Sequence, residues 1–411
     1  MPRITDPAQL VQGAEVIFDT AALTIELVVG AGSDVDNGGV TLKAYEFYYG
    51  RELREFNEVV NSGGAIVDDV TSSQIKLVTD TTANSSAKLT SYLYFPYTPQ
   101  HSNTAVFSIA CGDIGKTNVI RRWGLYDDDG LYFELSGTVL SVNIKSSITN
   151  TITSVTQDEF NTNALTSEVF DIYELDVSKY NFYWISYQWQ GIGVVKFGGY
   201  SPNGERIVLH AFENANINVT PYMKRGTLPI RLEQFNTGIA ASISEIKSSC
   251  INVERDSEKL QYVGNLQTVE VSPVIITNTL TPIVSLNVKP TINGLPNKSI
   301  IQPIELDFFN ENEAIIIEVL VANTLTGDNF ISYSKFTNLD VSATATSTDG
   351  IVMERFIVGV GEFKKSFPDS LIYTIVNREY VIGNKITIAA KTIKTGVSST
   401  LHLVGKWREI I

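Results

Sequence analysis

The chain has 411 residues, a formal net charge of −14 and a charged fraction of only 18%. A strongly acidic chain does not neutralise phosphates over a broad face, which argues against binding to nucleic acid or to an anionic membrane surface. The length allows about two or three domains. The 43% of hydrophobic residues is enough to form their cores, and the abundance of Thr, Ser, Asn, Val and Ile is typical of sheets and turns.

The two cysteines, Cys111 and Cys250, lie in dissimilar sequence surroundings. Two thiols in so long a chain form neither a disulfide framework nor a zinc site, so we expect two free thiols in a reducing cytoplasm. The N-terminus lacks the basic and apolar layout of a signal peptide, and no apolar run reaches the length of a membrane span. We therefore expect a soluble chain that is not exported by a signal peptide.

An N-terminal docking segment is predicted at 1–75. Residues 16–29 have the composition of β-structure, and a helix is predicted at 41–60, with Thr41 as its cap. Six apolar residues of this range recur every three or four positions and would share one helical face: Leu42, Tyr45, Tyr49, Leu53, Phe56 and Val60. We expect Tyr45, Tyr49, Leu53 and Phe56 to contact a partner. The alternative is that the helix covers one end of its own domain.

A β-sandwich domain is predicted at 76–255. The range 123–144 contains three β-prone runs separated by short Asp/Gly- and Ser/Gly-rich links, which predicts a three-stranded meander. A further set of strands follows at 183–190, 194–197 and 207–209. We expect Trp123 and Phe133 to pack inside this sandwich.

Five of the 13 prolines fall between Pro273 and Pro303, in a stretch that is also rich in Thr and Asn. This composition predicts an extended connector at 256–300. Strand-like runs return beyond it, and in the last of them Leu401, Leu403 and Trp407 share one parity. We predict a second, smaller β-sandwich at 301–411, so that the chain is mostly β apart from the N-terminal helix.

The acidic run Asp127–Asp129, followed by Gly130 and Glu134, could hold a metal ion. Calcium loops of the helix–loop–helix type place carboxylates at alternate positions and a glycine at the sixth. Here the glycine is fourth and no helix flanks the loop. Because Asp and Gly are also preferred in hairpin turns, we favour an exposed turn and expect no metal and no cofactor.

No constellation in the sequence indicates catalysis. The three histidines, His101, His210 and His402, are far apart and none has a metal-binding spacing. Paired carboxylates could support glycoside hydrolysis, but the sequence does not show which of them lie together. The available glutamates are Glu134, Glu159, Glu168, Glu174 and Glu213.

Six aromatic residues fall within ten positions, which suggests either a sugar-stacking surface or a core. They are Tyr180, Phe182, Tyr183, Trp184, Tyr187 and Trp189. Since Ile185, Tyr187 and Trp189 would share one side of a strand, we favour core packing.

Several segments, in a fixed order, resemble virion proteins of tailed bacteriophages. They are 121–138 (RRWGLYDDDGLYFELSGT), 184–198 (WISYQWQGIGVVKFG), 210–216 (HAFENAN), 221–231 (PYMKRGTLPIR) and 401–409 (LHLVGKWRE). The resemblance covers about a third of the chain, mostly 118–235. It implies a head, neck, tail or fibre protein with a lectin-like or jelly-roll (concanavalin-like) sandwich, located in the virion and assembled in the bacterial cytoplasm. It assigns no catalytic residue.

Two functions therefore remain open. The first is a non-enzymatic appendage or decoration protein that binds other virion chains as a homo-oligomer, because open sandwiches leave strand edges that pair with other chains. The second is a module of a tail fibre or spike that binds or degrades host glycans. Exposed aromatics beside two nearby carboxylates would favour the second function, and aromatics buried in the cores would favour the first.

Overall fold

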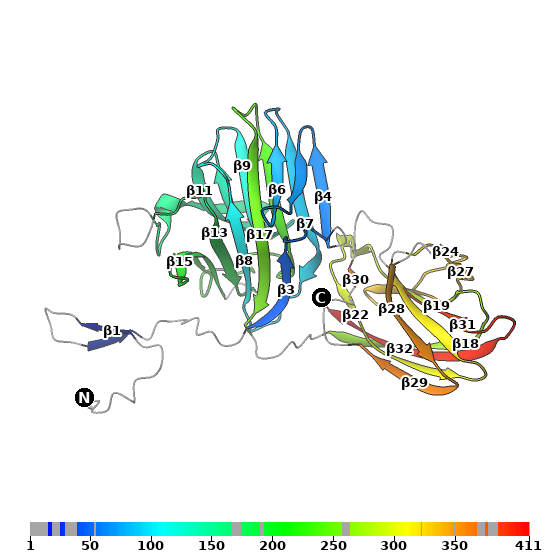
Figure 1. Cartoon of the computed structure of the whole chain (residues 1–411). Coiled ribbons are helices and arrows are strands. Elements are labelled where there is room, and N and C mark those ends of the chain that lie inside the picture. Colours follow the sequence, from blue (N-terminus) through cyan, green and yellow to red (C-terminus); the bar gives the residue numbers. More distant parts are fainter. Residues whose placement is uncertain are drawn as a thin grey trace.

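The computed structural model describes residues 39–52, 55–165, 174–189, 193–256, 264–321, 323–347, 351–367 and 385–410, and the backbone at 15–18, 25–28 and 375–376. These residues form antiparallel sheets that make up two β-sandwiches (Figure 1). The 3₁₀ turn Gln157–Glu159 is the helical element of the described part. The predicted fold class, mostly β with two sandwiches, is confirmed, whereas the predicted helix is wrong.

The first sandwich consists of sheets I and II. The strands of sheet I are β4 Phe56–Asn61, β7 Ser86–Phe95, β9 Val119–Tyr126, β10 Gly130–Ser136, β11 Val139–Ser146, β12 Thr151–Thr156 and β16 Leu228–Asn236. Those of sheet II are β3 Val40–Glu46, β5 Ala65–Asp69, β6 Gln74–Thr79, β8 Asn103–Ala110, β13 Asn181–Tyr187, β14 Val194–Tyr200, β15 Arg206–Glu213 and β17 Ser244–Arg255. The strand order is β12-β11-β10-β9-β16-β7-β4 in sheet I and β15-β14-β13-β8-β17-β6-β5 in sheet II, where β3 also pairs with β17.

The second sandwich consists of sheets III and IV. The strands of sheet III are β18 Asn265–Ile276, β22 Ile300–Asn310, β29 Gly361–Ser366, β30 Ile375–Val376 and β32 Ser399–Ile410. Those of sheet IV are β19 Thr281–Val288, β23 Ile315–Val321, β25 Ile331–Ser332, β26 Thr337–Asp340, β28 Ile351–Val358 and β31 Lys385–Thr392. Three two-stranded ribbons complete the description: β1 Glu15–Phe18 with β2 Ile25–Val28, β20 Thr291–Ile292 with β21 Leu295–Pro296, and β24 Leu325–Thr326 with β27 Ala345–Thr346.

The segment 41–60 forms β3 and β4 instead of a helix. A β-bulge explains the helix-like spacing: β17 residues Val253 and Glu254 pair with Lys43 and Thr41, which leaves Leu42 as the extra residue. This bulge puts Leu42 on the same face as Tyr45, three positions later, as a helix would. Tyr45 then packs against Phe56 of the facing sheet, with ring centroids 4.8 Å apart.

The four proposed contact residues of this segment therefore differ in exposure to solvent. Tyr45 and Phe56 are core residues, each 3% exposed, and do not present their rings to a partner. Tyr49 is 89% exposed, and Leu53 lies outside the described residues. Tyr49 is thus the member of the set that remains available at the surface.

The predicted domain boundaries also need correction. Strands β3 to β6 belong to the first sandwich, and β18 and β19 belong to the second, so 256–300 is not a connector. Three of the five prolines suggested a connector although they lie at β-bulges: the strand register shifts at Pro273, Pro282 and Pro303. Proline is tolerated in strands at such irregularities, where its missing N–H leaves no ladder bond unmade.

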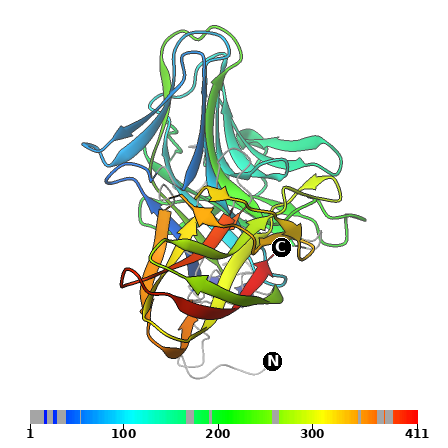
Figure 2. The ribbon, with the colours of Figure 1, turned by 90° about the vertical axis from the view of Figure 1, so that its right-hand side faces the viewer.

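The two sandwiches are in contact. Ile300 of β22 and Ile410 of β32 are buried within the hydrophobic cluster of the first sandwich. In Figure 2 the second sandwich faces the viewer, with the first sandwich rising above it. The described part of the chain is therefore two sandwiches that share a small apolar contact.

The meander β9-β10-β11 contributes the central aromatic packing of the first sandwich. Trp123 lies opposite Phe133 in the β9–β10 register, and their rings stack with centroids 5.6 Å apart. Tyr183 from sheet II contacts both rings, at 5.0 and 5.1 Å. The prediction that Trp123 and Phe133 pack inside the sandwich is confirmed.

We expect Trp123→Ala to lower the free energy of unfolding by about 3–5 kcal/mol, because it removes a fully buried indole from this stack. Asp128→Ala, at an exposed position of the adjoining turn, should change it by less than about 0.5 kcal/mol. Urea unfolding of both variants checks the prediction, and similar costs for the two would contradict it.

Candidate functional site

The acidic turn between β9 and β10 joins the two sandwiches. The Asp127 carboxylate accepts a hydrogen bond from Arg231 Nη2 at 2.7 Å and one from the Tyr94 hydroxyl at 2.6 Å. Lys298, in the segment before β22 of the second sandwich, places its Nζ 3.3 Å from Asp127 Oδ2 and donates to the Tyr94 hydroxyl at 2.9 Å. We call Asp127, Tyr94, Arg231 and Lys298 the junction.

The prediction of an exposed turn is wrong for most of this run. Asp128 is exposed, but Asp129 is only 2% exposed. Its carboxylate accepts hydrogen bonds from the amide and hydroxyl of Ser147, at 2.7 and 2.8 Å, and from the Lys224 amide at 3.1 Å. The turn is thus held by segments that lie far away in the sequence. Among the described residues, no three His, Cys, Asp or Glu side chains gather as metal ligands.

The charges around Asp127 stabilise its ionised form. Burial alone would raise its pKa, but Arg231, the hydrogen bond from Tyr94 and the charge of Lys298 outweigh burial and lower the pKa to about 2. The carboxylate is therefore charged and satisfied at neutral pH, which suits a structural role.

A row of charged side chains crosses the outer face of sheet I. Arg122 of β9 lies opposite Glu134 of β10 and Glu233 of β16, so its guanidinium stands between two carboxylates. Arg122 Nε is 2.5 Å from Glu134, and its Nη1 is 3.7 Å from Glu233. We call Glu134, Arg122 and Glu233 the charge row. The hydroxyl of Tyr126 also donates to Glu233, at 3.2 Å.

The same arginines cover aromatic rings on this face. Arg122 lies over Tyr132 and Arg231 lies over Tyr126, at 5.4 and 5.0 Å from the ring centroids. Tyr132 and Tyr126 are only 2% and 3% exposed although they point away from the core. Cation–π contacts of this kind stabilise partly desolvated charges. The rings therefore form part of a closed structural layer.

This arrangement does not resemble the carboxylate pair of a glycosidase. Such enzymes hold two carboxyl groups about 5–10 Å apart across space that the sugar and water occupy. Here the guanidinium of Arg122 occupies the space between Glu134 and Glu233. Of the other glutamates considered from the sequence, Glu159, Glu174 and Glu213 are exposed at separate positions, and Glu168 lies outside the described residues.

The three histidines occupy separate surroundings. His101 contacts the Asp256 carbonyl, His402 lies 3.2 Å from Glu311, and His210 Nδ1 accepts from the Asn161 amide at 3.2 Å. Burial lowers the pKa of His210, which favours its neutral form. None of these contacts joins a histidine to a nucleophile.

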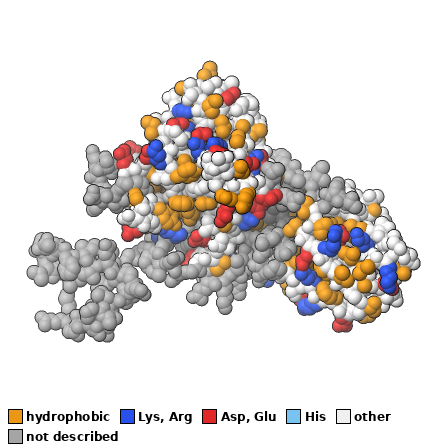
Figure 3. All heavy atoms as spheres, viewed as in Figure 1, with side chains coloured by type: hydrophobic (Ala, Val, Ile, Leu, Met, Phe, Trp, Pro, Cys, Tyr) orange, Lys and Arg blue, Asp and Glu red, His pale blue; other side chains and the backbone are white. Residues whose placement is uncertain are grey.

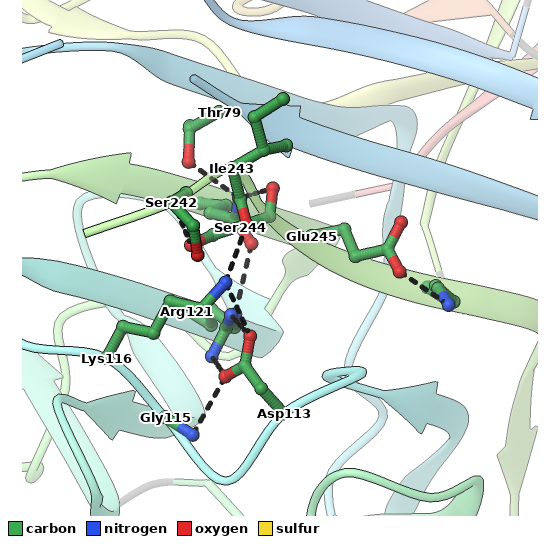
Figure 4. Close-up of polar contacts among 11 residues, drawn as sticks. Thr79, Asp113, Gly115, Lys116, Arg121, Ser242, Ile243, Ser244 and Glu245 are labelled. Carbon is green, nitrogen blue, oxygen red and sulfur yellow. Dashed lines mark hydrogen bonds and ion pairs between the residues drawn. The ribbon is translucent and has the colours of Figure 1, made fainter. Parts of the chain in front are cut away.

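A second polar cluster, which the sequence did not reveal, lies at the other end of β9 (Figure 4). Arg121 is fully buried and donates to both carboxylate oxygens of Asp113, at 2.9 and 2.8 Å, and to Gln234 at 3.1 Å. Lys116 donates to the Ile243 carbonyl at 2.6 Å. These bonds hold the β8–β9 and β16–β17 loops together, and those loops expose Ile114, Ile239 and Ile243.

The aromatic run 180–189 separates into two groups. Tyr183 and Tyr187 are buried in the core and Trp189 packs against it, which confirms the core interpretation for these three residues, whereas Trp184 is buried on the other side of β13. Tyr180 and Phe182 are each 47% exposed. The sequence pattern did not separate the two groups, because both lie in β13 or within two residues of its ends.

No protein-family model and no curated protein matches this chain. Solved structures match about half of it. A glycoside hydrolase family protein from Mycobacterium thermorestibile gives a TM-score of 0.33 at 11% identity, over 52% of this chain and 99% of that one. A protein described as an immunostimulatory antigen and pseudo β-1,3-glucanase of Mycobacterium tuberculosis gives 0.35 at 10% identity, over 53% and 100%.

The carbohydrate recognition domain of Emp46p gives a TM-score of 0.29 at 12% identity, over 49% of this chain and 88% of that one. None of these three proteins is described as a phage virion protein. At such scores and identities the likeness says nothing of what this chain binds or cleaves. Within the described part of the chain, no helix is long and apolar enough to cross a membrane.

The junction predicts a specific pH dependence of stability. The pKa of Asp127 falls from 3.8 to about 2 on folding, so its contribution is present above about pH 4 and is lost as the pH falls toward 2. A shift of this size corresponds to roughly 2 kcal/mol. We expect Asp127→Asn to cost about that much at pH 7, and the difference from the unsubstituted protein to shrink between pH 4 and pH 2.

Urea unfolding at a series of pH values measures this difference. Asp128→Asn is the matched control, because that neighbouring side chain is exposed and should show almost no effect at any pH. An Asp127→Asn cost that stayed constant down to pH 2 would show that the charge of Asp127 does not stabilise the junction.

Proposed function

We propose that this chain is a non-enzymatic structural component of a tailed-phage virion, where it binds other virion chains and copies of itself. Its place would be an appendage, decoration, neck, tail or fibre position, reached by assembly in the bacterial cytoplasm. No cofactor, metal, nucleic acid or membrane is part of this role. The proposal rests on what the residues of the phage-like segments do in the structure.

The phage-like segments supply the structural polar groups of sheet I, and this observation carries the proposal. Segment 121–138 contains Arg122, Asp127 and Glu134, and segment 221–231 contains Arg231. These four side chains form two ion pairs, Arg122 with Glu134 and Arg231 with Asp127. The segments that resemble virion proteins therefore contribute paired charges, which supports a structural role over a catalytic one.

The surface of the chain offers contacts of the kind that assembly uses. Ile114, Ile239 and Ile243 are 68%, 76% and 64% exposed on loops held by the buried Arg121–Asp113 pair. Strands β12, β15, β18 and β28 lie at sheet edges, where unpaired backbone groups can pair with another chain. Both features suit a protein that contacts neighbours repeatedly around a symmetry axis.

The alternative from the sequence, a host-glycan module, divides in two. The glycan-degrading form is disfavoured because Arg122 separates the two carboxylates of the charge row. The glycan-binding form has a separate observation in its favour, the exposed aromatic rings Tyr180 and Phe182. Glycan binding is compatible with a structural role in the same particle.

Electron cryomicroscopy of the intact particle tests the proposal. We expect this chain in several symmetry-related copies, each with a contact to a like chain or another virion chain of at least about 1,000 Å². Ile239→Asp should weaken incorporation if the loop end is the contact, whereas Val219→Asp is a matched control at an exposed apolar residue of a different loop. Absence of the chain from purified particles would reject the proposal.

A further inference from the structure

We propose that the outer face of sheet II carries a carbohydrate-binding strip formed by Tyr180, Phe182 and Tyr200, whose ligand is a neutral polysaccharide. The strip lies on the opposite sheet from the charge row and shares no residue with the junction. It goes beyond the proposed virion role, because its argument and its test do not depend on where the chain is assembled.

Two of the rings lie side by side on neighbouring strands. Tyr183 pairs with Gly199 in the β13–β14 register, which places Phe182 opposite Tyr200. Their ring centroids are 6.0 Å apart with an interplanar angle of 71°. Phe182 is 47% exposed, so one ring of the pair is open to ligand while the other supports it.

A glycine next to the strip allows a tryptophan ring to pack directly on the sheet. Trp184, two residues along the same side of β13, is fully buried and donates to the Gly199 carbonyl at 2.9 Å. Its indole covers Gly198, where any side chain would clash with the ring. The register also shifts at Phe197/Gly198, a β-bulge. The indole of Trp184 therefore packs against the sheet next to Phe182, in space that Gly198 leaves free.

The third ring is held by a strand farther along the same sheet. The Tyr180 hydroxyl donates to Gln74 Oε1 at 2.5 Å, and Gln74 in turn donates to Asp69 at 2.8 Å. Gln74 belongs to β6, which β8 and β17 separate from β13. Tyr180 thus extends the strip toward β6, and its orientation is fixed before any ligand binds, which lowers the entropic cost of binding.

Polar groups border the rings at each step. The Ser108 and Ser249 hydroxyls lie 2.6 Å apart on β8 and on the bulge of β17, with Ser108 directly opposite Phe182. At the other end, Arg206 donates to the Tyr200 hydroxyl at 2.7 Å and lies 3.7 Å from Glu254. Ser108 is buried, whereas Ser249, Arg206 and Glu254 are at least partly exposed and can exchange hydrogen bonds with a sugar hydroxyl.

This combination fits a saccharide better than a protein. The centre of a protein interface is depleted of charged residues, whereas here charged and hydroxyl groups lie beside every ring. Figure 3 shows hydrophobic side chains in small groups, separated by charged and polar ones, on the face it displays. A sugar ring presents apolar C–H groups to an aromatic face and hydroxyls at its edge. Lys76 and Arg206 nearby already pair with Asp69 and Glu254, which disfavours an anionic polymer.

Isothermal titration calorimetry of the full chain tests the strip, with chitohexaose, cellohexaose and laminarihexaose as probes. We expect at least one hexasaccharide to bind and Phe182→Ala to weaken it at least tenfold. Tyr180→Phe, which removes only the hydroxyl that bonds Gln74, should weaken it several-fold while the protein stays folded. Tyr49→Ala is the matched control, since Tyr49 is an exposed tyrosine outside the strip and should leave affinity unchanged.

Three results would overturn the proposal. One is the absence of binding by all three hexasaccharides at millimolar concentration. Another is an equal loss of binding in Tyr49→Ala. The third is a smaller oligomer for the isolated Phe182→Ala protein than for the unsubstituted protein, which would identify the strip as a contact between copies of the chain. Failure here leaves the contacts expected in the particle unaffected, so the two proposals can fail separately.

Discussion

The carboxylate of Asp127 is the point at which the acidic turn, the outer face of sheet I and the second sandwich meet. Arg231, Tyr94 and Lys298 each contact it, and each comes from a different part of the chain. Next to this polar contact, Ile300 and Ile410 enter the apolar cluster of the first sandwich. The junction therefore combines a partly buried charge with apolar burial, and removing one partner of such a charge is costly.

Charge compensation on sheet I also limits what the site can do chemically. A general acid in a glycosidase must hold its proton near neutral pH, which requires an environment that disfavours the carboxylate. Around Asp127 the opposite holds, because arginine and lysine lower its pKa. Glu134 and Glu233 both face the guanidinium of Arg122, which lies between the two carboxylates. The polar face of sheet I thus suits stability, while the aromatic strip of sheet II is the surface that remains open.

The sequence predicted the β-class, the meander and the burial of Trp123 because these depend on local alternation and turn residues. The prediction of elements from the sequence failed where a β-bulge changed the spacing of residues along a strand. Leu42 and Tyr45 mimicked a helix, and Pro273 and Pro282 mimicked a linker, although each pattern arises at a register shift. It also could not find the charge row, since Arg122 and Glu233 are far apart in the chain and meet only through the β9–β16 register. Lys298 gave no local signal at all.

We propose that the carboxylates on sheet I are structural and not catalytic. The free energies of unfolding of Glu134→Gln and Glu233→Gln, each compared with the unsubstituted chain, test it most directly. Catalytic carboxylates usually reduce stability, so their replacement tends to stabilise a protein. If the role is structural, Glu134→Gln should lower the free energy of unfolding by about 1–3 kcal/mol, because it removes a charge-assisted hydrogen bond to Arg122. Glu233→Gln should lower it by less. A gain in stability for either variant would contradict it.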